Sequence, residues 1–241
     1  MQRKVLNMVS LRETFNKQLE KIRNETLLLG SMVEQAMIVA VDTLIAHDTR
    51  GAQITLENDL QINEKRFSIE NAILITMATQ QPMAHDLRLL ASLLEIATEL
   101  ERMGDYAKGI GKVTKLLGDT DMELPADDLK EMCRIAVDML HQGLIAFIEE
   151  DVDKARRIPV QDDEVDALYN KVYRFAVEQM MNDRNMIDRS NYLLWVGHNI
   201  ERMADRVVNI CERTVFTATG ELMEIDTYDD EGDDSEIVIP E

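Results

Sequence analysis

The sequence contains few of the residues on which β-sheet and disulfide-rich proteins depend. Aromatic residues make up 5% of its 241 positions, and it has ten glycines, four prolines and two cysteines. Strands favour aromatic and β-branched side chains, and the turns of all-β folds need glycine and proline, so this composition argues against a sheet protein. Leucine, isoleucine, alanine, methionine and glutamate are plentiful instead, which is typical of helices.

The two cysteines, Cys133 and Cys211, stand alone on apolar helical patterns. Isolated cysteines of this kind are usually buried and behave as small apolar side chains. We therefore expect unreactive thiols rather than a disulfide or a pair of metal ligands.

Basic residues are scarce relative to acidic ones, at 26 against 46, and the net charge is −20. Ten of the acids lie in residues 221–241, where there is no lysine or arginine. That segment is too poor in apolar residues to offset its ordering entropy, so we expect a disordered acidic tail. The rest of the chain has no basic stripe with interleaved aromatics, which argues against nucleic-acid binding.

Long apolar runs and catalytic motifs are also missing. We identify no run of about 18 to 20 apolar residues, the length that a membrane-spanning helix needs. The first residues also lack the apolar segment of a signal peptide. We therefore expect a cytoplasmic protein without membrane insertion. The sequence has no Gly-x-Ser-x-Gly, His-Glu-x-x-His or phosphate-binding loop. These absences predict that the protein is not an enzyme.

What the sequence does contain is an internal repeat. Glu101-Arg-Met-Gly-Asp105 returns one hundred residues later as Glu201-Arg-Met-Ala-Asp205. A second block, from Asp48 to Asn63, returns upstream of it from Asp151 to Asp166. Two blocks repeated in the same order indicate duplication of a whole domain. We expect the copies to span residues 11–118 and 127–220, followed by the tail at 221–241.

Apolar residues recur at steps of three, four and seven from Phe15 to Ala40, which predicts a long amphipathic helix. The same reasoning and the expected caps give helices at residues 11–45, 49–79, 85–117, 127–149, 151–181 and 188–217. Pro159 should break or kink the fifth of these near its start. The predicted fold is all-α, with six helices arranged as two tandem antiparallel three-helix bundles.

Acidic residues spaced four apart recur at equivalent positions in both copies. The pairs are Glu101 with Asp105, Glu201 with Asp205, Asp162 with Asp166 and, less perfectly, Asp59 with Asn63. Such pairs stand on one helix face, and two pairs on neighbouring antiparallel helices could offer three or four oxygen ligands to a cation. The alternative is a solvated acidic surface screened by Arg102 and Arg202 in weak ion pairs.

Two further patterns bear on function. A ferritin-like di-iron centre needs Glu-x-x-His on two helices, and none of the four histidines has a glutamate three residues before it. The segment Gln80-Gln81-Pro82-Met83-Ala84-His85-Asp86-Leu87-Arg88 is unusually polar for a helix start. It is either a local loop with a proline near the helix opening or a docking surface, and the sequence does not choose between them.

With these residues in view, the chain resembles the PhoU family of phosphate-uptake regulators from about residue 15 to residue 217. The resemblance rests on the duplicated three-helix unit, the Gln80–Arg88 segment and the two Glu-Arg-Met-x-Asp motifs. It implies a cytoplasmic negative regulator of phosphate uptake and phosphate-starvation signalling. Such proteins act as adaptors between the ATPase subunit of the high-affinity phosphate transporter and a sensor histidine kinase, and the resemblance also suggests a homodimer.

The resemblance further implies multinuclear iron, zinc or manganese bound through Glu/Asp-x-x-x-Asp motifs. In this chain those motifs fall on Glu101, Asp105, Asp162, Asp166, Glu201 and Asp205, with Asp59 and Asn63 completing the first copy. Asn63 departs from the pattern, because a neutral amide replaces a carboxylate and weakens a site for a hard cation. The competing hypothesis is a metal store or a carboxylate metalloenzyme built on the same bundle.

Overall fold

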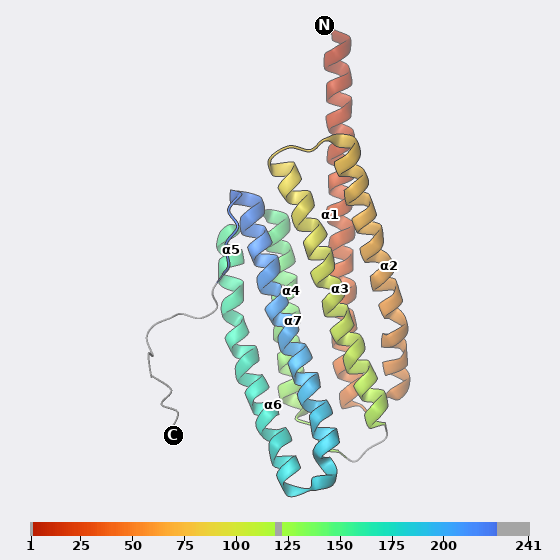
Figure 1. Cartoon of the computed structure of the whole chain (residues 1–241), viewed down its shortest axis with the longest axis vertical. Coiled ribbons are helices and arrows are strands. Elements are labelled where there is room, and N and C mark those ends of the chain that lie inside the picture. The colour runs from red at the N-terminus through yellow and green to blue at the C-terminus, as the bar shows by residue number, and fades with distance from the viewer. Residues whose placement is uncertain (1, 119–121, 226–241) are drawn as a thin grey trace, which may run out of the picture.

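The computed structural model describes residues 2–118 and 122–225, with side chains from residue 12 onward, and shows two bundles of long helices (Figure 1). The first bundle consists of α1 (Gln2–Ile45), α2 (Thr49–Gln80) and α3 (His85–Leu117). The second consists of α4 (Ala126–Glu149), α6 (Asp162–Asn182) and α7 (Ile187–Thr219), with the short α5 (Val152–Arg157) before α6. The described residues contain no strand, and the predicted all-α repeat of three-helix bundles is confirmed.

The fifth expected helix is interrupted where Pro159 was predicted to break it. A 3₁₀ turn at Ile158–Gln161 separates α5 from α6, and a second short 3₁₀ turn, Arg184–Met186, precedes α7. Proline has no N–H to donate to the preceding turn, and its ring clashes with the backbone there. The first helix is longer than expected, since α1 begins at Gln2 and not at residue 11.

The duplicated blocks begin at matching helix caps. The Asp48 side chain accepts hydrogen bonds of 3.0 Å from the backbone N–H groups of Arg50 and Gly51 at the start of α2. Asp151 accepts a bond of 2.9 Å from the N–H of Lys154 at the start of α5. An aspartate in extended conformation at this position pairs N–H groups that the helix itself leaves free.

The two bundles share one hydrophobic core. Helix α3 packs against α7 and α1 packs against α4, while α2 and α6 lie at the two outer sides (Figure 1). The buried apolar side chains of both bundles form a single continuous cluster. The short connection between the copies therefore joins halves that are packed together.

Helix α1 corrects one expectation from the sequence. Its segment Arg12–Ile45 is long and apolar enough to span a membrane by length and composition, although no such stretch was expected. The reason is packing on several sides, because α1 contacts α2, α3 and α4. Leu29, Val33 and Met37 are completely buried there. A core helix of a soluble protein can be as long and as apolar as a membrane-spanning helix.

The chain leaves α7 through Gly220, whose φ of 84° is the left-handed conformation that favours glycine at a helix end. Residues 221–225 are not helical, and the N–H of Ile225 donates to Glu212 Oε1 at 3.0 Å. The remainder of the predicted disordered tail, residues 226–241, lies outside the described residues.

Both cysteines are buried, as predicted. Burial raises the pKa of the Cys133 and Cys211 thiols to about 12. Since the thiolate is the reactive form, both remain unreactive thiols at neutral pH.

Candidate functional site

The eight predicted site residues form one cluster of four in each bundle. The first-bundle cluster consists of Asp59 and Asn63 on α2 with Glu101 and Asp105 on α3. The second-bundle cluster consists of Asp162 and Asp166 on α6 with Glu201 and Asp205 on α7. The two helices that carry each cluster are packed neighbours, so the structure brings the repeated pairs together.

A lysine fills the first-bundle cluster. Lys108 Nζ donates to Asp59 Oδ2 at 2.6 Å and lies 3.5 Å from Asp105 Oδ1. The bond to Asp59 raises the pKa of Lys108, which holds its positive charge more firmly. Asp59 is almost fully buried, so the lysine supplies the charge that this carboxylate needs.

The other two members of the first-bundle cluster adapt to this arrangement. Asn63 Nδ2 donates to Asp59 Oδ2 at 3.1 Å, which a second carboxylate at that position could not do. Burial, followed by the neighbouring charge of Asp105, raises the pKa of Glu101. The cluster is thus partly neutralised by groups that belong to the chain.

The second-bundle cluster has no such lysine. Val208 stands one hundred residues after Lys108, at the equivalent position of the repeat. Among the described residues, no lysine or arginine forms an ion pair with any of the four carboxylates. Four acidic groups are therefore gathered without a lysine or arginine bonded to them.

Asp162 has the largest shift in pKa among the four carboxyl groups of the second-bundle cluster. It is 7% exposed, and its Oδ1 atom is buried without a hydrogen-bond partner. Burial, with the charges of Asp205, Asp166 and Glu201, raises the pKa of Asp162 to about 7. Near neutral pH this carboxyl group is therefore divided between its protonated and its ionised form.

The remaining carboxylates follow the same trend. Burial raises the pKa of Asp166, Glu201 and Asp205, and for Asp166 and Glu201 the charge of Asp205 adds to it. His198 opposes the shift, since its Nδ1 lies 2.9 Å from Glu201 Oε2. A protonated histidine would balance only part of the charge of four carboxylates.

The donor set of the second-bundle cluster fits a cation. Four carboxylates supply hard oxygen ligands, and the free Oδ1 of Asp162 is a buried acceptor without a partner. The described part of the chain holds no three acidic, histidine or cysteine side chains already arranged as metal ligands. The first-bundle cluster fits a cation less well, because Lys108 already occupies the space between its carboxylates.

The arginines expected to screen the acids do not bond to them. Arg102 donates to Glu99 at 3.1 Å, and the guanidinium of Arg202 lies 5.0 Å from the centre of the Tyr106 ring. Sequence reasoning missed Lys108, although its place three residues after Asp105 and its absence from the second copy were visible. Its bond to Asp59 joins residues 49 positions apart, which only the fold reveals.

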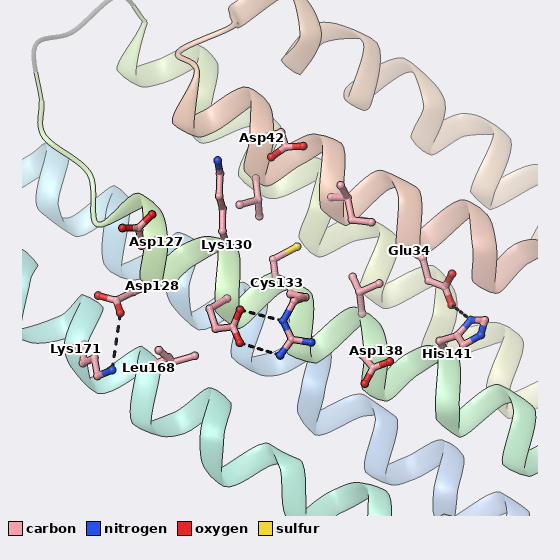
Figure 2. Close-up of a pocket in the computed structure, with 15 residues that line it drawn as sticks. Glu34, Asp42, Asp127, Asp128, Lys130, Cys133, Asp138, His141, Leu168 and Lys171 are labelled. Carbon is pink, nitrogen blue, oxygen red and sulfur yellow. Dashed lines mark hydrogen bonds and ion pairs between the residues drawn. The ribbon is translucent and has the colours of Figure 1, made fainter.

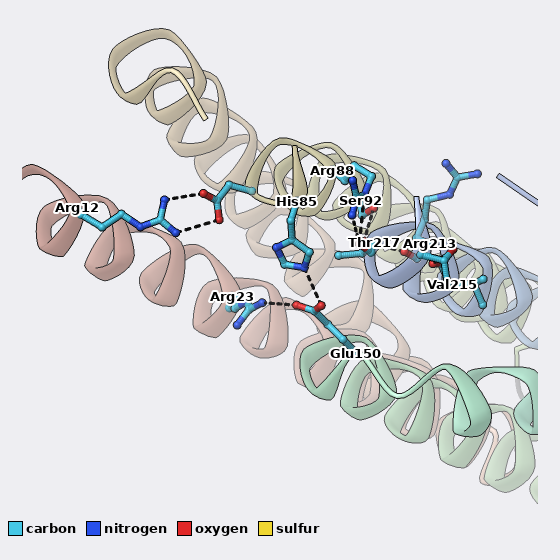
Figure 3. A network of polar contacts seen from close by, with 11 residues as sticks. Arg12, Arg23, His85, Arg88, Ser92, Glu150, Arg213, Val215 and Thr217 are labelled. Atoms are coloured by element: carbon cyan, nitrogen blue, oxygen red, sulfur yellow. Dashed lines mark hydrogen bonds and ion pairs between the residues drawn. The ribbon is translucent and has the colours of Figure 1, made fainter. Parts of the chain in front are cut away.

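Part of the polar Gln80–Arg88 segment joins the two bundles (Figure 3). His85 Nε2 lies 2.7 Å from Glu150 Oε2, and Arg23 donates to the other oxygen of Glu150 at 3.0 Å. Arg88 donates two bonds of 3.2 Å to the backbone oxygen of Thr217 near the end of α7. Met83, by contrast, is 79% exposed, and the two residues that join the bundles, His85 and Arg88, lie in the second half of the segment.

Comparison with known proteins gives a consistent result. A family model described as the PhoU domain matches residues 26–114 and again residues 129–214. The chain is 31% identical over 215 residues to a phosphate-specific transport system accessory protein PhoU homolog from Clostridium acetobutylicum, covering 89% of this chain and 98% of that protein. It is 33% identical to the Escherichia coli accessory protein PhoU, covering 86% of each.

A solved structure agrees. The phosphate transport system regulatory protein PhoU from Streptococcus pneumoniae superimposes with a TM-score of 0.80 at 30% sequence identity, covering 87% of this chain and 99% of that one. Sequence and fold therefore point to the same relatives over most of the chain.

Proposed function

The chain belongs to the PhoU family, and from this premise we propose that it is a cytoplasmic negative regulator of phosphate uptake and phosphate-starvation signalling rather than an enzyme. Its proposed partners are the ATPase subunit of a high-affinity phosphate transporter and a phosphate-sensing histidine kinase, and it would act as a homodimer. Support comes from relatives that are named as phosphate transport accessory or regulatory proteins. This chain matches nearly the whole length of each of them.

The second-bundle cluster is the proposed metal site. The observation that carries this assignment is the gathering of four carboxylates with raised pKa values and no bonded lysine or arginine. Asp162 and Asp166 would hold a cation from α6, and Glu201 and Asp205 would hold it from α7. Iron, zinc or manganese would supply positive charge there, and the carboxylates would tie the two helices together.

The chemistry proposed for this site is structural. A bound cation removes the repulsion among the four carboxylates, and their side chains can then turn toward a common point. Fixing α6 against α7 would set the shape of the outer side of the second bundle. We propose that this controlled shape is what a partner recognises, which would make the site part of an adaptor and not of a catalyst.

Elemental analysis of the purified protein tests the metal site. The double variant Glu201→Ala with Asp205→Ala should lose the metal, while Glu101→Ala with Asp105→Ala makes the same chemical change in the lysine-filled cluster and should keep most of it. Circular dichroism confirms that both remain helical. Equal metal content in all three proteins would contradict the assignment to the second-bundle cluster.

Trp195 offers an independent readout of binding. It is the single tryptophan of the chain, lies on α7 six residues before Glu201, and is 45% exposed. Titration with manganese, which quenches nearby tryptophan emission, should follow a saturable curve in the native protein and a flat one in the Glu201, Asp205 variant.

The regulatory role needs a separate test in cells. Removing the protein should raise expression from a phosphate-starvation promoter in phosphate-rich medium, and restoring it should repress that promoter again. Purified transporter ATPase and kinase cytoplasmic domain should each bind the native protein. Normal repression without the protein would overturn the proposed function, whatever the metal content.

A further inference from the structure

A large groove lies over the outward side of α4 (Figure 2). Helices α1 and α6 form its two walls, and its volume is about 1020 Å³. The apolar lining residues are Ile38 and Val41 from α1, Cys133 and Val137 from α4, and Leu168 from α6. Three helices thus place apolar side chains along one groove, of which Ile38 is 38% exposed, Val137 and Leu168 are half-buried, and Val41 and Cys133 are buried.

The rim of the groove carries an excess of acids. Six acidic side chains line it, namely Glu34, Asp42, Asp127, Asp128, Glu131 and Asp138. Only three lysines or arginines line it, Lys130, Arg134 and Lys171. In Figure 2, Asp127 lies at one end of the groove, Asp42 lies on α1 across from Cys133, and Asp138 lies farther along α4 toward His141.

Some of this charge is already balanced within the groove. Arg134 bonds to Glu131 at 2.8 Å and Lys171 lies 4.0 Å from Asp128, while Glu34 lies 3.3 Å from His141, which balances its charge only when the imidazole is protonated. These contacts do not involve Asp42, Asp127 or Asp138.

Three acids of the rim have no ion pair. Among the described residues, Asp42 and Asp127 have no ionic partner, and Asp138 accepts one bond, of 2.7 Å, from the neutral amide of Gln142. Lys130 is the single lining base without an acid bonded to it. The groove therefore presents an apolar floor with unbalanced negative charge along its edges.

We propose that this groove docks an amphipathic helix of a partner protein, with apolar side chains facing the floor and lysines or arginines along its flanks. A trough between helices receives such a helix through apolar residues three and four positions apart. Charge complementarity selects the basic flanks, because the unpaired acids along the rim attract them and repel acidic ones. A second copy of this chain would bring the same acidic rim and a net charge of −20.

The proposal goes beyond phosphate regulation and does not depend on it. The groove is lined by α1, α4 and the middle of α6, and none of the eight residues of the acidic clusters lines it. Helix docking is measured by peptide binding, so its failure can be told apart from a failure of metal binding or of repression.

The test uses synthetic helical peptides and the full chain. The probe is a fluorescent peptide of about 18 residues, or five turns, with leucines on one face and lysines on the other. Two companion peptides have the lysines replaced by glutamates, or the same residues in an order that scatters the leucines. Fluorescence anisotropy should give saturable, one-to-one binding of the first peptide and none of the other two.

Paired protein variants locate the binding. Asp42→Lys with Asp138→Lys should weaken the lysine peptide on the order of tenfold. Glu20→Lys with Glu64→Lys makes the same change in net charge at exposed positions outside the groove and should weaken it much less. Equal weakening would show attraction to the acidic protein as a whole and would overturn the proposal.

A second pair tests the floor without changing charge. Ile38→Gln removes an apolar side chain that lines the groove, and Leu60→Gln removes an exposed one from α2. We expect about a fivefold loss for the first and no change for the second. Equal binding of the glutamate peptide, no difference between the two glutamine variants, or a dimer in solution that the groove variants dissociate would each overturn helix docking.

Discussion

The two acidic clusters descend from one repeated pattern, but their negative charge is balanced in different ways. In the first bundle Lys108 bonds to a buried aspartate and Asn63 replaces a carboxylate. In the second, the equivalent positions are Val208 and Asp166, and all four carboxylates have raised pKa values. The difference teaches that duplicated motifs need not keep one role. One copy has an internal cation, and the other has no lysine or arginine bonded to its four carboxylates.

The largest effect should come from removing the internal cation. Lys108→Met leaves Asp59 buried without a positive partner, and we expect a loss of about 3 kcal/mol in the free energy of unfolding. Urea unfolding followed by circular dichroism measures it. Lys112→Met is the control, since Lys112 is exposed on the same helix. Adding Asp59→Asn to the first variant should restore most of the stability, and a loss below about 1 kcal/mol would show that Lys108 does not balance the buried charge.

The second effect concerns pH and the metal-free protein. The pKa of Asp162 rises from 3.8 to about 7 on folding, so its contribution to stability is fully present at low pH and is lost progressively as the pH rises from about 4 through about 7. Asp162→Asn should therefore stabilise the metal-free protein on the order of 2 kcal/mol at pH 8 and have little effect at pH 4. Asp163→Asn, on the neighbouring exposed residue, should not show this pH dependence. A constant difference across the pH range would contradict the role of Asp162.

A third change makes the second cluster resemble the first. Val208→Lys places an ammonium group where Lys108 stands in the other copy. We expect a gain of about 1 kcal/mol for the metal-free protein near neutral pH, together with loss of bound metal. Thermal unfolding and elemental analysis give the two readouts. Val208→Met controls for size, and metal retained in the lysine variant would show that the cation does not bind between these carboxylates.

The smallest change works in the opposite direction. Asn63→Asp adds a carboxylate beside Asp59 and removes the amide hydrogen bond to it. We expect a loss of roughly 0.5 to 1 kcal/mol in stability near neutral pH. Double-mutant analysis with Lys108→Met should show coupling between the two positions, because both contact Asp59. Simple additivity would mean that the first cluster is not one network.

The sequence was sufficient for features set by neighbours along the chain. Helical periodicity predicted the six helices, and Pro159 predicted the break before α6. Recurrence of four-residue spacing identified the acidic pairs. Each of these features depends on residues within a few turns, which is the range over which propensity and spacing are informative.

Features set by packing could not be predicted. The bond from Lys108 to Asp59 and the contact of His85 with Glu150 join distant segments, and neither spacing nor composition marks the partners. The burial of α1 on several sides likewise depends on α4, from the other copy. The unpaired acidic rim of the groove becomes visible only when α1 and α6 are placed beside α4.

The continuous core across both bundles has a consequence for how the molecule unfolds. Because the apolar sides of α1 and α3 are covered by α4 and α7, neither half can open alone without exposing them to water. Heating or denaturant should therefore produce one cooperative transition, with the same midpoint for probes placed in either half. A fragment ending between the repeats would keep its helices but expose a wide apolar surface, and it would aggregate. The sequence repeat indicates that the chain arose from two copies of one unit, but we expect the two halves to unfold together as a single cooperative unit.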